Sequence, residues 1–387
     1  MKPVYLDHAA ASPLRPEVRE AMAPFRDGLV GNPSSVHRWG RSARATLEEA
    51  RDRTAALLGV GGREIRFVRG GTESVNLAIL GRFGGSQAEG KGEPLFVRSS
   101  LEHSAVRESM DELSSRGARV ETVSVAPSGE IDMPGLEALL REKPELVSFQ
   151  WVNQETGIVL PIPEIAERCR AAGVLLHVDA VQATGRVPLD LTENPIPLLS
   201  LSAHKLGGPR GMGVLLVRSG AEIRPILFGG GQEGEIRPGT EDIAGAVGTA
   251  RALEVALWEL EEEVDRLSEL RDLLATRLKE GIERLRVHAE HAPRAPHILN
   301  VGIPELPRDL LPGALDLEGV AISAGSACRS GSTAVSPVLE ALYGPSAGSV
   351  APIRFSFGWT TTREDVEFAA ETTPRVVERM RTLGVGG

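Results

Sequence analysis

Short apolar strands and amphipathic helices alternate over the first two-thirds of this chain. Apolar runs of strand length lie at 64–68, 95–98, 120–125, 146–151, 174–178, 198–201 and 214–218. Apolar residues at helical spacing between them predict helices, which include 105–116, 134–141 and 163–172. Strands separated by helices are typical of a mostly parallel sheet. The sequence therefore predicts an α/β fold.

The pattern changes after about residue 240. The spacing of apolar residues predicts one long helix over 241–284, then strands at 297–302, 320–323 and 353–357 and a closing helix. Because strands are fewer here and helix predominates, a smaller α+β unit is favoured. We predict a large α/β domain over 14–255 and a small C-terminal α+β domain over 256–387, with residues 1–13 packed against the small domain.

Charge and cysteine content exclude several classes of protein. The chain has 43 basic and 53 acidic residues, a net charge of −10, which argues against a broad nucleic-acid-binding surface. No apolar run approaches the roughly 20 residues of a membrane span, and the first residues lack the apolar stretch of a secretory signal. Two cysteines and eight histidines without ligand spacing predict no metal site and no disulfide scaffold. We therefore expect a cytoplasmic protein.

Polar clusters follow five of the predicted strands, at the point where each strand ends. They are Gly70–Thr72, Ser99–His103, Asn153–Gly157, Asp179–Gln182 and Ser202–Lys205. In open α/β sheets, ligands bind at the carboxyl ends of the strands. Each cluster alone is compatible with a solvated loop or a helix cap. Together they predict one site at one edge of the sheet.

The residue types in these clusters indicate a particular chemistry. Lys205 can form a Schiff base with a carbonyl compound, and Asp179 can hold a protonated ring nitrogen. A lysine Schiff base with an acidic partner for the ring is how proteins use pyridoxal 5′-phosphate as an electron sink. Gly71 and Thr72 at a helix start suit a phosphate, and His103 can stack on the ring and move protons. Taken singly, Thr72 and Asp179 are ordinary helix caps and His103 an ordinary surface histidine.

Two residues of the C-terminal third add a nucleophile and an anion ligand. Cys328 lies in a small, polar, glycine-bearing loop beside Arg329, which favours the thiolate, so we interpret it as a nucleophile. Cys169, within the helix predicted over 163–172, is interpreted as an inert core residue. Arg354 lies in an apolar strand and needs an anionic partner. A substrate carboxylate or an internal salt bridge would supply one.

Collinear motifs resemble those of the cysteine desulfurases, in the NifS/IscS-like group of class V pyridoxal-phosphate enzymes. They are Tyr5–Ala10, Asn32–His37, Gly70–Ser74, Glu102–His103, Val178–Gln182, Ser202–Lys205, Arg237–Thr240, Gly325–Cys328 and Arg354–Ser356. The resemblance runs nearly from end to end. It implies the fold-type I architecture, with a large, mostly parallel sheet domain and a smaller α+β domain.

The resemblance also implies how the coenzyme ring is held. Lys205 would bind pyridoxal 5′-phosphate covalently, and Asp179 would pair with its ring nitrogen. His103 would stack on the ring and Gln182 would bond its phenolic oxygen. Gln154 stands near the ring, where the family more often has asparagine.

The remaining roles concern the phosphate, the substrate and the partner subunit. Gly71, Thr72, Ser202 and His204 would bind the phosphate, and Thr240 would arrive from the second subunit of a homodimer. For the substrate, Arg354 and Asn32 would orient the carboxylate of L-cysteine. Cys328 would take the sulfur as a persulfide while L-alanine leaves.

The resemblance therefore implies a desulfurase that serves iron–sulfur cluster assembly or another sulfur-transfer pathway through an unidentified acceptor protein. Two other interpretations stay open. One is another class V enzyme, such as a selenocysteine lyase or a small-amino-acid aminotransferase. The other is a non-catalytic sulfur carrier or assembly partner, although the set of Lys205, Asp179 and His103 argues against lost catalysis.

Overall fold

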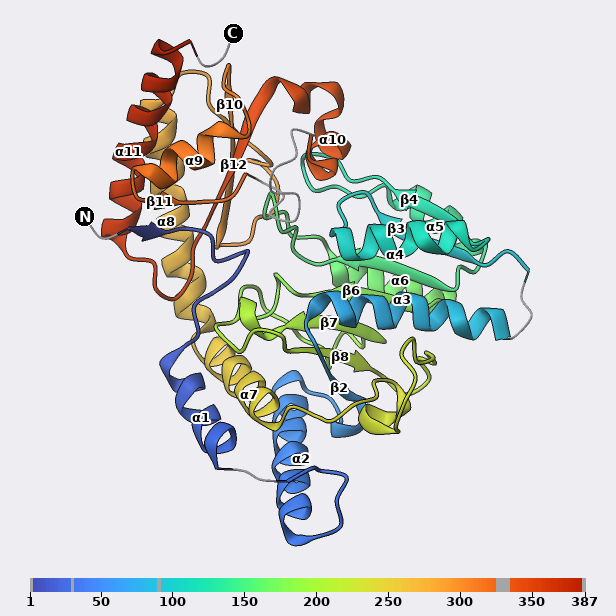
Figure 1. Cartoon of the computed structure of the whole chain (residues 1–387). Coiled ribbons are helices and arrows are strands. Elements are labelled where there is room, and N and C mark those ends of the chain that lie inside the picture. Colours follow the sequence, from blue (N-terminus) through green and yellow to red (C-terminus); the bar gives the residue numbers. More distant parts are fainter. Residues whose placement is uncertain (1–2, 29–30, 89–91, 325–334, 385–387) are drawn as a thin grey trace.

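The computed structural model describes residues 3–28, 31–88, 92–324 and 335–384. Its largest element is a seven-stranded sheet with the order β2-β8-β7-β6-β5-β3-β4 (Figure 1). The strands are β2 (Ile65–Val68), β3 (Leu95–Ser99), β4 (Arg119–Val123), β5 (Leu146–Gln150), β6 (Leu176–Asp179), β7 (Leu198–Ser202) and β8 (Gly213–Val217). The strands from β4 to β7 are parallel, and only β8 runs against its two neighbours. The predicted mostly parallel α/β sheet is confirmed.

Helices cover both faces of this sheet, because successive side chains of a buried strand point to opposite faces. Leu198 of β7 faces one apolar core and Leu199 faces the other. The first core contains side chains of α3 (Gly71–Ala88) and α4 (Ser104–Ser115). The second contains side chains of α1 (Pro16–Asp27), α2 (Arg38–Leu58), α5 (Met133–Arg141), α6 (Ile162–Ala172) and α7 (Ile243–Trp258).

A third core lies in the upper part of Figure 1 and belongs to the C-terminal segment. Its antiparallel sheet has the order β12-β10-β9, and β1 pairs with β11 in parallel. The strands are β1 (Val4–Tyr5), β9 (Arg286–Val287), β10 (Ile298–Pro304), β11 (Val320–Ala321) and β12 (Val350–Ser356). The helices are α8 (Leu260–Gly281), α9 (Leu310–Leu317) and α11 (Arg363–Thr382), whereas α10 (Pro337–Tyr343) packs on the second core through Val338 and Leu342. Val4 and Leu6 are buried in this core. The domain limits at 14 and 255 stay a prediction.

The single helix predicted over 241–284 is wrong. Helix α7 ends at Trp258 and α8 begins at Leu260, and Glu259 between them has φ −88° and ψ 0°. The Glu259 carboxylate pairs with Arg15 at 2.7 Å. Because no glycine or proline marks this break, the apolar spacing continues through it and gives no warning.

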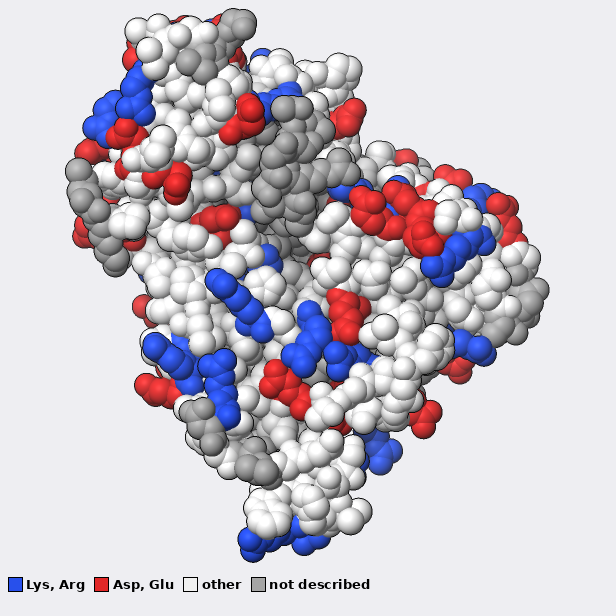
Figure 2. Space-filling model, viewed as in Figure 1, with Lys and Arg blue, Asp and Glu red and all other residues white. Residues whose placement is uncertain are grey.

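Charged side chains of both signs are interspersed on the face shown in Figure 2. No helix among the described residues combines the length and the apolar character needed to cross a bilayer.

A buried ion pair connects α2 with the glycine-rich segment 229–239, which precedes α7. Arg51 donates to both carboxylate oxygens of Glu233, at 2.7 and 2.9 Å, and the backbone N–H of Phe67 donates to the same carboxylate at 2.8 Å. Both residues of the pair are at least nine-tenths buried. The pair therefore anchors this segment to the edge strand β2.

We expect Arg51→Ala to lower the thermal midpoint of unfolding strongly, because it leaves the Glu233 carboxylate buried without a cation. Removal of one partner from such a pair costs about 3–5 kcal/mol. Arg53→Ala on the same helix is the control, since its pair with Glu254 lies at the surface and contributes less than about 1 kcal/mol. Thermal melts followed by circular dichroism compare the two variants, and equal midpoints would contradict the assignment.

Candidate active site

A cavity of about 250 Å³ lies where the carboxyl ends of the parallel strands meet the N-terminal segment and β12. It is lined by residues that the sequence analysis singled out: Gly71, Thr72, His103, Gln154, Asp179, Gln182, Ser202, His204, Lys205 and Arg354. The predicted convergence at one sheet edge is thus present. The polar residues at the strand ends share one space.

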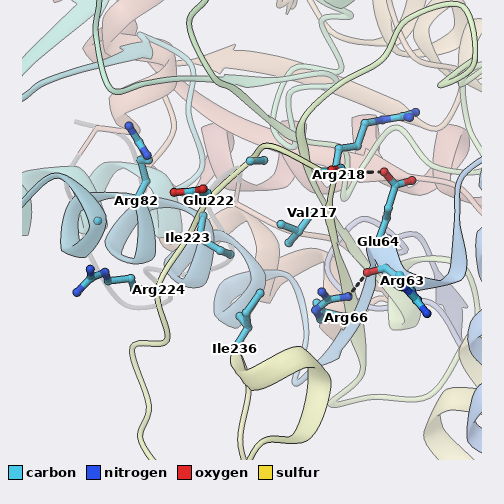
Figure 3. Close-up of a pocket in the computed structure, with 13 residues that line it drawn as sticks. Arg63, Glu64, Arg66, Arg82, Val217, Arg218, Glu222, Ile223, Arg224 and Ile236 are labelled. Carbon is cyan, nitrogen blue, oxygen red and sulfur yellow. Dashed lines mark hydrogen bonds between the residues drawn. The ribbon is translucent and has the colours of Figure 1, made fainter. Parts of the chain in front are cut away.

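A second cavity is larger, about 550 Å³, but holds none of these residues. Several arginines line it, among them Arg66, Arg82 and Arg224 (Figure 3). Arg82 pairs with Glu145, and Arg66 donates to backbone carbonyl oxygens. Figure 3 shows the side chains of Arg82 and Arg224 directed away from Arg66. Because the guanidinium groups do not converge, we place the active site in the smaller cavity.

Lys205 stands on the short turn that follows β7. Its Nζ donates to the backbone oxygens of Ala9 and Ala10 at 2.6 and 2.7 Å. The N-terminal segment therefore forms one wall of the cavity, and its carbonyl groups hold the amine there. A nucleophilic amine at a strand end is what Schiff-base chemistry requires.

Asp179 is the last residue of β6 and is 3% exposed. Its Oδ1 accepts a hydrogen bond from the backbone N–H of Val181 at 3.0 Å. Burial raises the pKa of this carboxyl to about 6, while the Val181 N–H and the charge of Lys205 oppose the rise. A buried carboxylate near the amine is a suitable partner for a protonated ring nitrogen.

His103 caps α4, and its Nδ1 accepts from the backbone N–H of Ala105 at 3.1 Å. The ring proton of the neutral imidazole therefore resides on Nε2. Burial, then the charges of Lys205 and Arg107, lower the pKa of His103 to about 4. A neutral imidazole is available to stack on an aromatic ring and to carry a proton at Nε2.

An anion cradle lies at the start of α3. Backbone N–H groups at the first turn of a helix are free to bind a phosphate. Ser202 Oγ lies 2.9 Å from Nδ1 of His204, and both residues line the same cavity. A Cβ on Gly71 would lie 2.8 Å from Cγ2 of Val181, so the close approach of these segments requires glycine at position 71.

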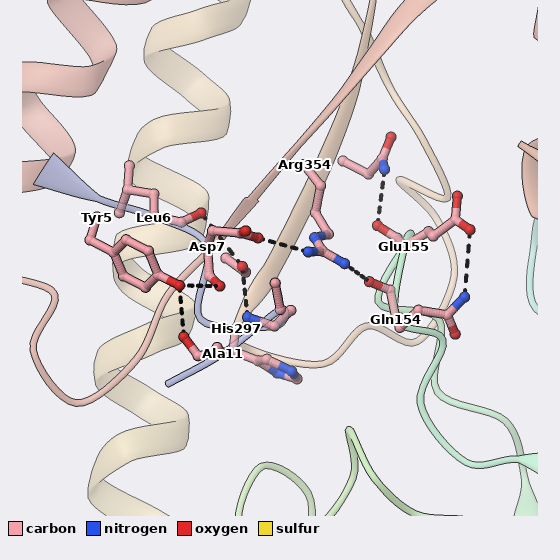
Figure 4. A network of polar contacts seen from close by, with 12 residues as sticks. Tyr5, Leu6, Asp7, Ala11, Gln154, Glu155, His297 and Arg354 are labelled. Carbon is pink, nitrogen blue, oxygen red and sulfur yellow. Dashed lines mark hydrogen bonds and ion pairs between the residues drawn. The ribbon is translucent and has the colours of Figure 1, made fainter. Parts of the chain in front are cut away.

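Arg354 is 2% exposed and belongs to the polar network in Figure 4. Its Nη2 pairs with Oδ1 of Asp7 at 2.8 Å, and its Nη1 donates to the backbone oxygen of Gln154 at 2.7 Å. Its buried Nε has no hydrogen-bond partner in the described part of the chain. The internal salt bridge that the sequence left as one alternative is therefore present, on a residue that also lines the cavity.

Not every predicted site residue is found among the described residues that line this cavity. Asn32 and Thr240 are exposed and do not line it. Cys328 lies outside the described residues. Cys169 is buried in the core, as predicted, and burial raises the pKa of its thiol to about 12.

Several residues to which the sequence motifs assign no role support the site. Glu102 is fully buried, and its Oε1 accepts from Ser99 Oγ at 2.6 Å and from the backbone N–H of Gln150 at 2.8 Å, which holds the ends of β3 and β5 together. Asp7 orients Arg354, and His297 contacts Gln182. The partners of the last two pairs lie more than 100 residues apart, so no local spacing reveals them.

The set of groups around the cavity fits a flat aromatic aldehyde that carries a phosphate and a basic ring nitrogen. The amine of Lys205, the carboxylate of Asp179 and the imidazole of His103 suit the aldehyde, the nitrogen and the ring. The cradle at Gly71 suits the phosphate, and Arg354 suits the carboxylate of an amino acid. The site therefore fits pyridoxal 5′-phosphate and an amino-acid substrate.

Comparisons with known proteins agree with this chemistry. The family model described as "Aminotransferase class-V" matches residues 4–368. The chain is 39% identical to the cysteine desulfurase IscS of Dictyoglomus turgidum over 98% of this chain and 96% of that protein. It is 37% identical to the putative cysteine desulfurase IscS 1 of Bacillus subtilis over 98% and 100% of the two chains.

Solved structures give the same result. A NifS-like protein superposes with a TM-score of 0.89 at 31% identity, covering 97% of this chain and 100% of the other. The NifS-like protein of Rickettsia africae superposes with a TM-score of 0.86 at 27% identity, covering 97% and 99%. With its fold and its site geometry, this chain belongs to the cysteine desulfurase family of the class V aminotransferases, which depend on pyridoxal 5′-phosphate.

Proposed function

We propose that this protein is a pyridoxal 5′-phosphate-dependent cysteine desulfurase. It takes the sulfur of L-cysteine as a persulfide on Cys328 and releases L-alanine. The observation that carries the proposal is the single cavity in which Lys205, Asp179 and His103 lie with Arg354. Similarity to named cysteine desulfurases over nearly the whole chain supports it.

Each residue has a defined task in this proposal. When bound, the coenzyme supplies an electron sink next to the amino-acid nitrogen. Lys205 holds the aldehyde carbon, and Asp179 keeps a proton on the ring nitrogen. His103 packs against the ring and holds a proton at Nε2. Arg354 binds the substrate carboxylate and so fixes the thiol side of L-cysteine in one direction.

The sulfur step balances without an added oxidant. The thiolate of Cys328 attacks the sulfur of the substrate, an S–S bond forms and the C–S bond breaks. The electron pair of that bond returns to carbon, which takes a proton to become the methyl group of L-alanine. The persulfide then passes to an acceptor protein, for iron–sulfur cluster assembly or another sulfur-transfer pathway.

The test is turnover of L-cysteine by the holoenzyme. We expect alanine and reducible sulfur in equal amounts, and the peptide that contains Cys328 heavier by the mass of one sulfur atom. Alanine formed from selenocysteine but not from cysteine would indicate a selenocysteine lyase. Transfer of the amino group to a 2-oxo acid would indicate an aminotransferase, and a protein that stays colourless with added coenzyme would indicate a non-catalytic carrier.

The pKa of Asp179 leads to a prediction about coenzyme binding. Below about pH 6 the carboxyl of the coenzyme-free protein is neutral and must lose its proton to hold a protonated ring nitrogen. Affinity for the coenzyme therefore falls as the pH drops through 6. Asp179→Asn lacks this charge at every pH, and we expect about 10- to 100-fold weaker binding at pH 8, the value of a charge-assisted hydrogen bond.

Fluorescence titration of both coenzyme-free proteins between pH 5 and pH 8 measures the effect. The ratio of the two affinities isolates the contribution of Asp179, because every other residue of the site is the same in both proteins. This ratio should be constant above about pH 7 and shrink below pH 6. A ratio independent of pH over the whole range would contradict the role given to Asp179.

We further propose that the enzyme is a cytoplasmic homodimer in which Thr240 completes the phosphate site of the partner subunit. Thr240 is exposed and lies outside the cavity of its own chain. The nearby Phe228 is 89% exposed and Leu227 is 48% exposed. Adjacent exposed apolar side chains of this size are typical of surfaces that a protein partner covers. The low cysteine content supports a reducing compartment.

Mixed dimers test the shared site. A dimer of one Lys205→Ala chain and one Thr240→Val chain keeps one intact site, so it should recover up to about half of the wild-type turnover. The assay is run at a coenzyme concentration too low to load Thr240→Val alone. Lys205→Ala paired with Thr72→Val is the control and should recover nothing, because both residues serve the cavity of their own chain. Equal recovery in the two mixtures would rule out the exchange of Thr240.

A further inference from the structure

The side-chain amide of Gln182 is held from two directions at the edge of the active-site cavity. Its Nε2 donates to the backbone oxygen of Ala9 at 2.9 Å. Its Oε1 lies 3.1 Å from Nε2 of His297. Gln182 is 5% exposed and His297 is 2% exposed, so both side chains are buried. The two contacts together decide how the amide is oriented.

The hydrogen positions follow from the chemistry of the partners. The Ala9 carbonyl only accepts hydrogen bonds, so the amide nitrogen of Gln182 must face it. The amide oxygen must then face His297, and Nε2 of His297 must carry the proton that it donates. Nδ1 of His297 is buried and has no partner among the described residues, which agrees with an unprotonated nitrogen. His297 is therefore the neutral Nε2–H tautomer.

The surroundings keep His297 neutral. Burial, followed by the positive charges of Arg186 and Arg354, lowers the pKa of His297 well below its ordinary value. His8 and Lys205 act in the same direction. The backbone oxygen of His297 accepts from the N–H of Phe357 at 2.9 Å, so the end of β12 holds its main chain. The imidazole is thus a fixed donor beside the network of Figure 4.

We infer that His297 is a positioning residue that locks the Gln182 amide so that its second N–H is available to the phenolic oxygen of the coenzyme. The inference rests on the proposed function, because it assigns a role toward that coenzyme. Gln182 lines the cavity, and only one of its two N–H bonds is used on Ala9. Without the donor at position 297, the amide oxygen loses its partner and the amide is free to turn.

The consequence is visible in the absorption of the bound coenzyme. A hydrogen-bond donor stabilises negative charge on the phenolic oxygen. In the high-pH form of the coenzyme, less positive charge offsets this negative charge, so the donor stabilises the high-pH form more than the low-pH form. Loss of the donor therefore favours the low-pH form and raises the pH at which the visible band titrates. We expect a rise of about 0.5–1 pH unit, and about 3- to 10-fold weaker coenzyme binding, in line with the loss of one hydrogen bond.

The experiment compares four holoenzymes by titrating the visible band against pH. His297→Phe keeps a ring of similar size but has no donor, so its midpoint should rise by the amount given above. His297→Gln places an amide N–H near the position of Nε2, and its midpoint should return to the wild-type value. His288→Leu is the matched control, since this buried histidine bonds Asn300 at 2.6 Å and does not line the cavity. Its midpoint should not move.

The double variant His297→Phe with Gln182→Leu completes a double-mutant cycle with the two single variants. Its midpoint should equal that of Gln182→Leu alone, because His297 acts only through Gln182. A further shift in the double variant, or a wild-type midpoint in His297→Phe, would overturn the inference. A wild-type protein that forms no visible band with the coenzyme would instead overturn the proposed function.

A measurement on the unaltered sequence covers the case in which His297→Phe does not fold. Nitrogen-15 resonances of labelled histidine distinguish the two neutral tautomers, and the resonance missing from His297→Gln identifies residue 297. We expect the Nε2–H form in the wild-type holoenzyme. The Nδ1–H form would refute the orientation assigned to Gln182.

Discussion

Replacement of Lys205 by alanine will abolish the turnover of L-cysteine, with a loss of at least about 10³-fold, as expected for removal of a covalent catalyst. Lys205 is the only lysine that lines the cavity within the described part of the chain. The carbonyl groups of Ala9 and Ala10 hold its amine at the edge of the sheet.

Two further substitutions separate the covalent role from charge. Lys205→Arg keeps a positive charge but has no primary amine that can form a Schiff base, so it should be as inactive as Lys205→Ala. Lys143→Ala is the control, since this exposed lysine donates to the backbone oxygen of Ala172 far from the cavity. Alanine formation is measured for all three. Borohydride reduction of the wild-type holoenzyme should attach the coenzyme to the Lys205 peptide, and attachment elsewhere would contradict the assignment.

Replacement of Cys328 by alanine is expected to remove sulfide release from L-cysteine, by at least about 10²-fold, and to leave the visible absorption of the bound coenzyme unchanged. The two effects separate because the thiol attacks sulfur and takes no part in holding the coenzyme. Nucleophilic strength requires the thiolate, so wild-type turnover should also fall as the pH drops below the titration range of the thiol.

The matched control for Cys328 is the other cysteine of the chain. Cys169→Ala removes a buried thiol whose pKa is raised to about 12, and turnover should stay near the wild-type value. Sulfide release and alanine are quantified together for both variants. Unchanged desulfurase turnover in Cys328→Ala would remove its role as nucleophile and leave the rest of the site assignment intact.

Local pattern predicted the large sheet well. The run at 198–201 became β7 (Leu198–Ser202), and the run at 95–98 became β3 (Leu95–Ser99). Buried parallel strands are short, nearly continuous apolar runs, and this signal needs no knowledge of the partner strand. The break at Glu259 carried no such signal, because no glycine or proline marks it and the Glu259 side chain pairs with Arg15, which lies more than 200 residues away in the sequence.

The distinction between local signals and contacts of distant segments also applies to the site. The sequence by itself determined which chemical groups follow the strands, namely the amine of Lys205, the carboxyl of Asp179 and the imidazole of His103. A strand end is a local feature, and parallel strands bring their carboxyl ends to one edge. Only the tertiary structure decided that Asp7 orients Arg354 and that His297 holds Gln182. Contacts between segments more than 100 residues apart depend on how the chain returns to pack against itself, within one core for Asp7 and Arg354 and between the large sheet and the C-terminal segment for Gln182 and His297. No periodicity within either segment encodes that packing.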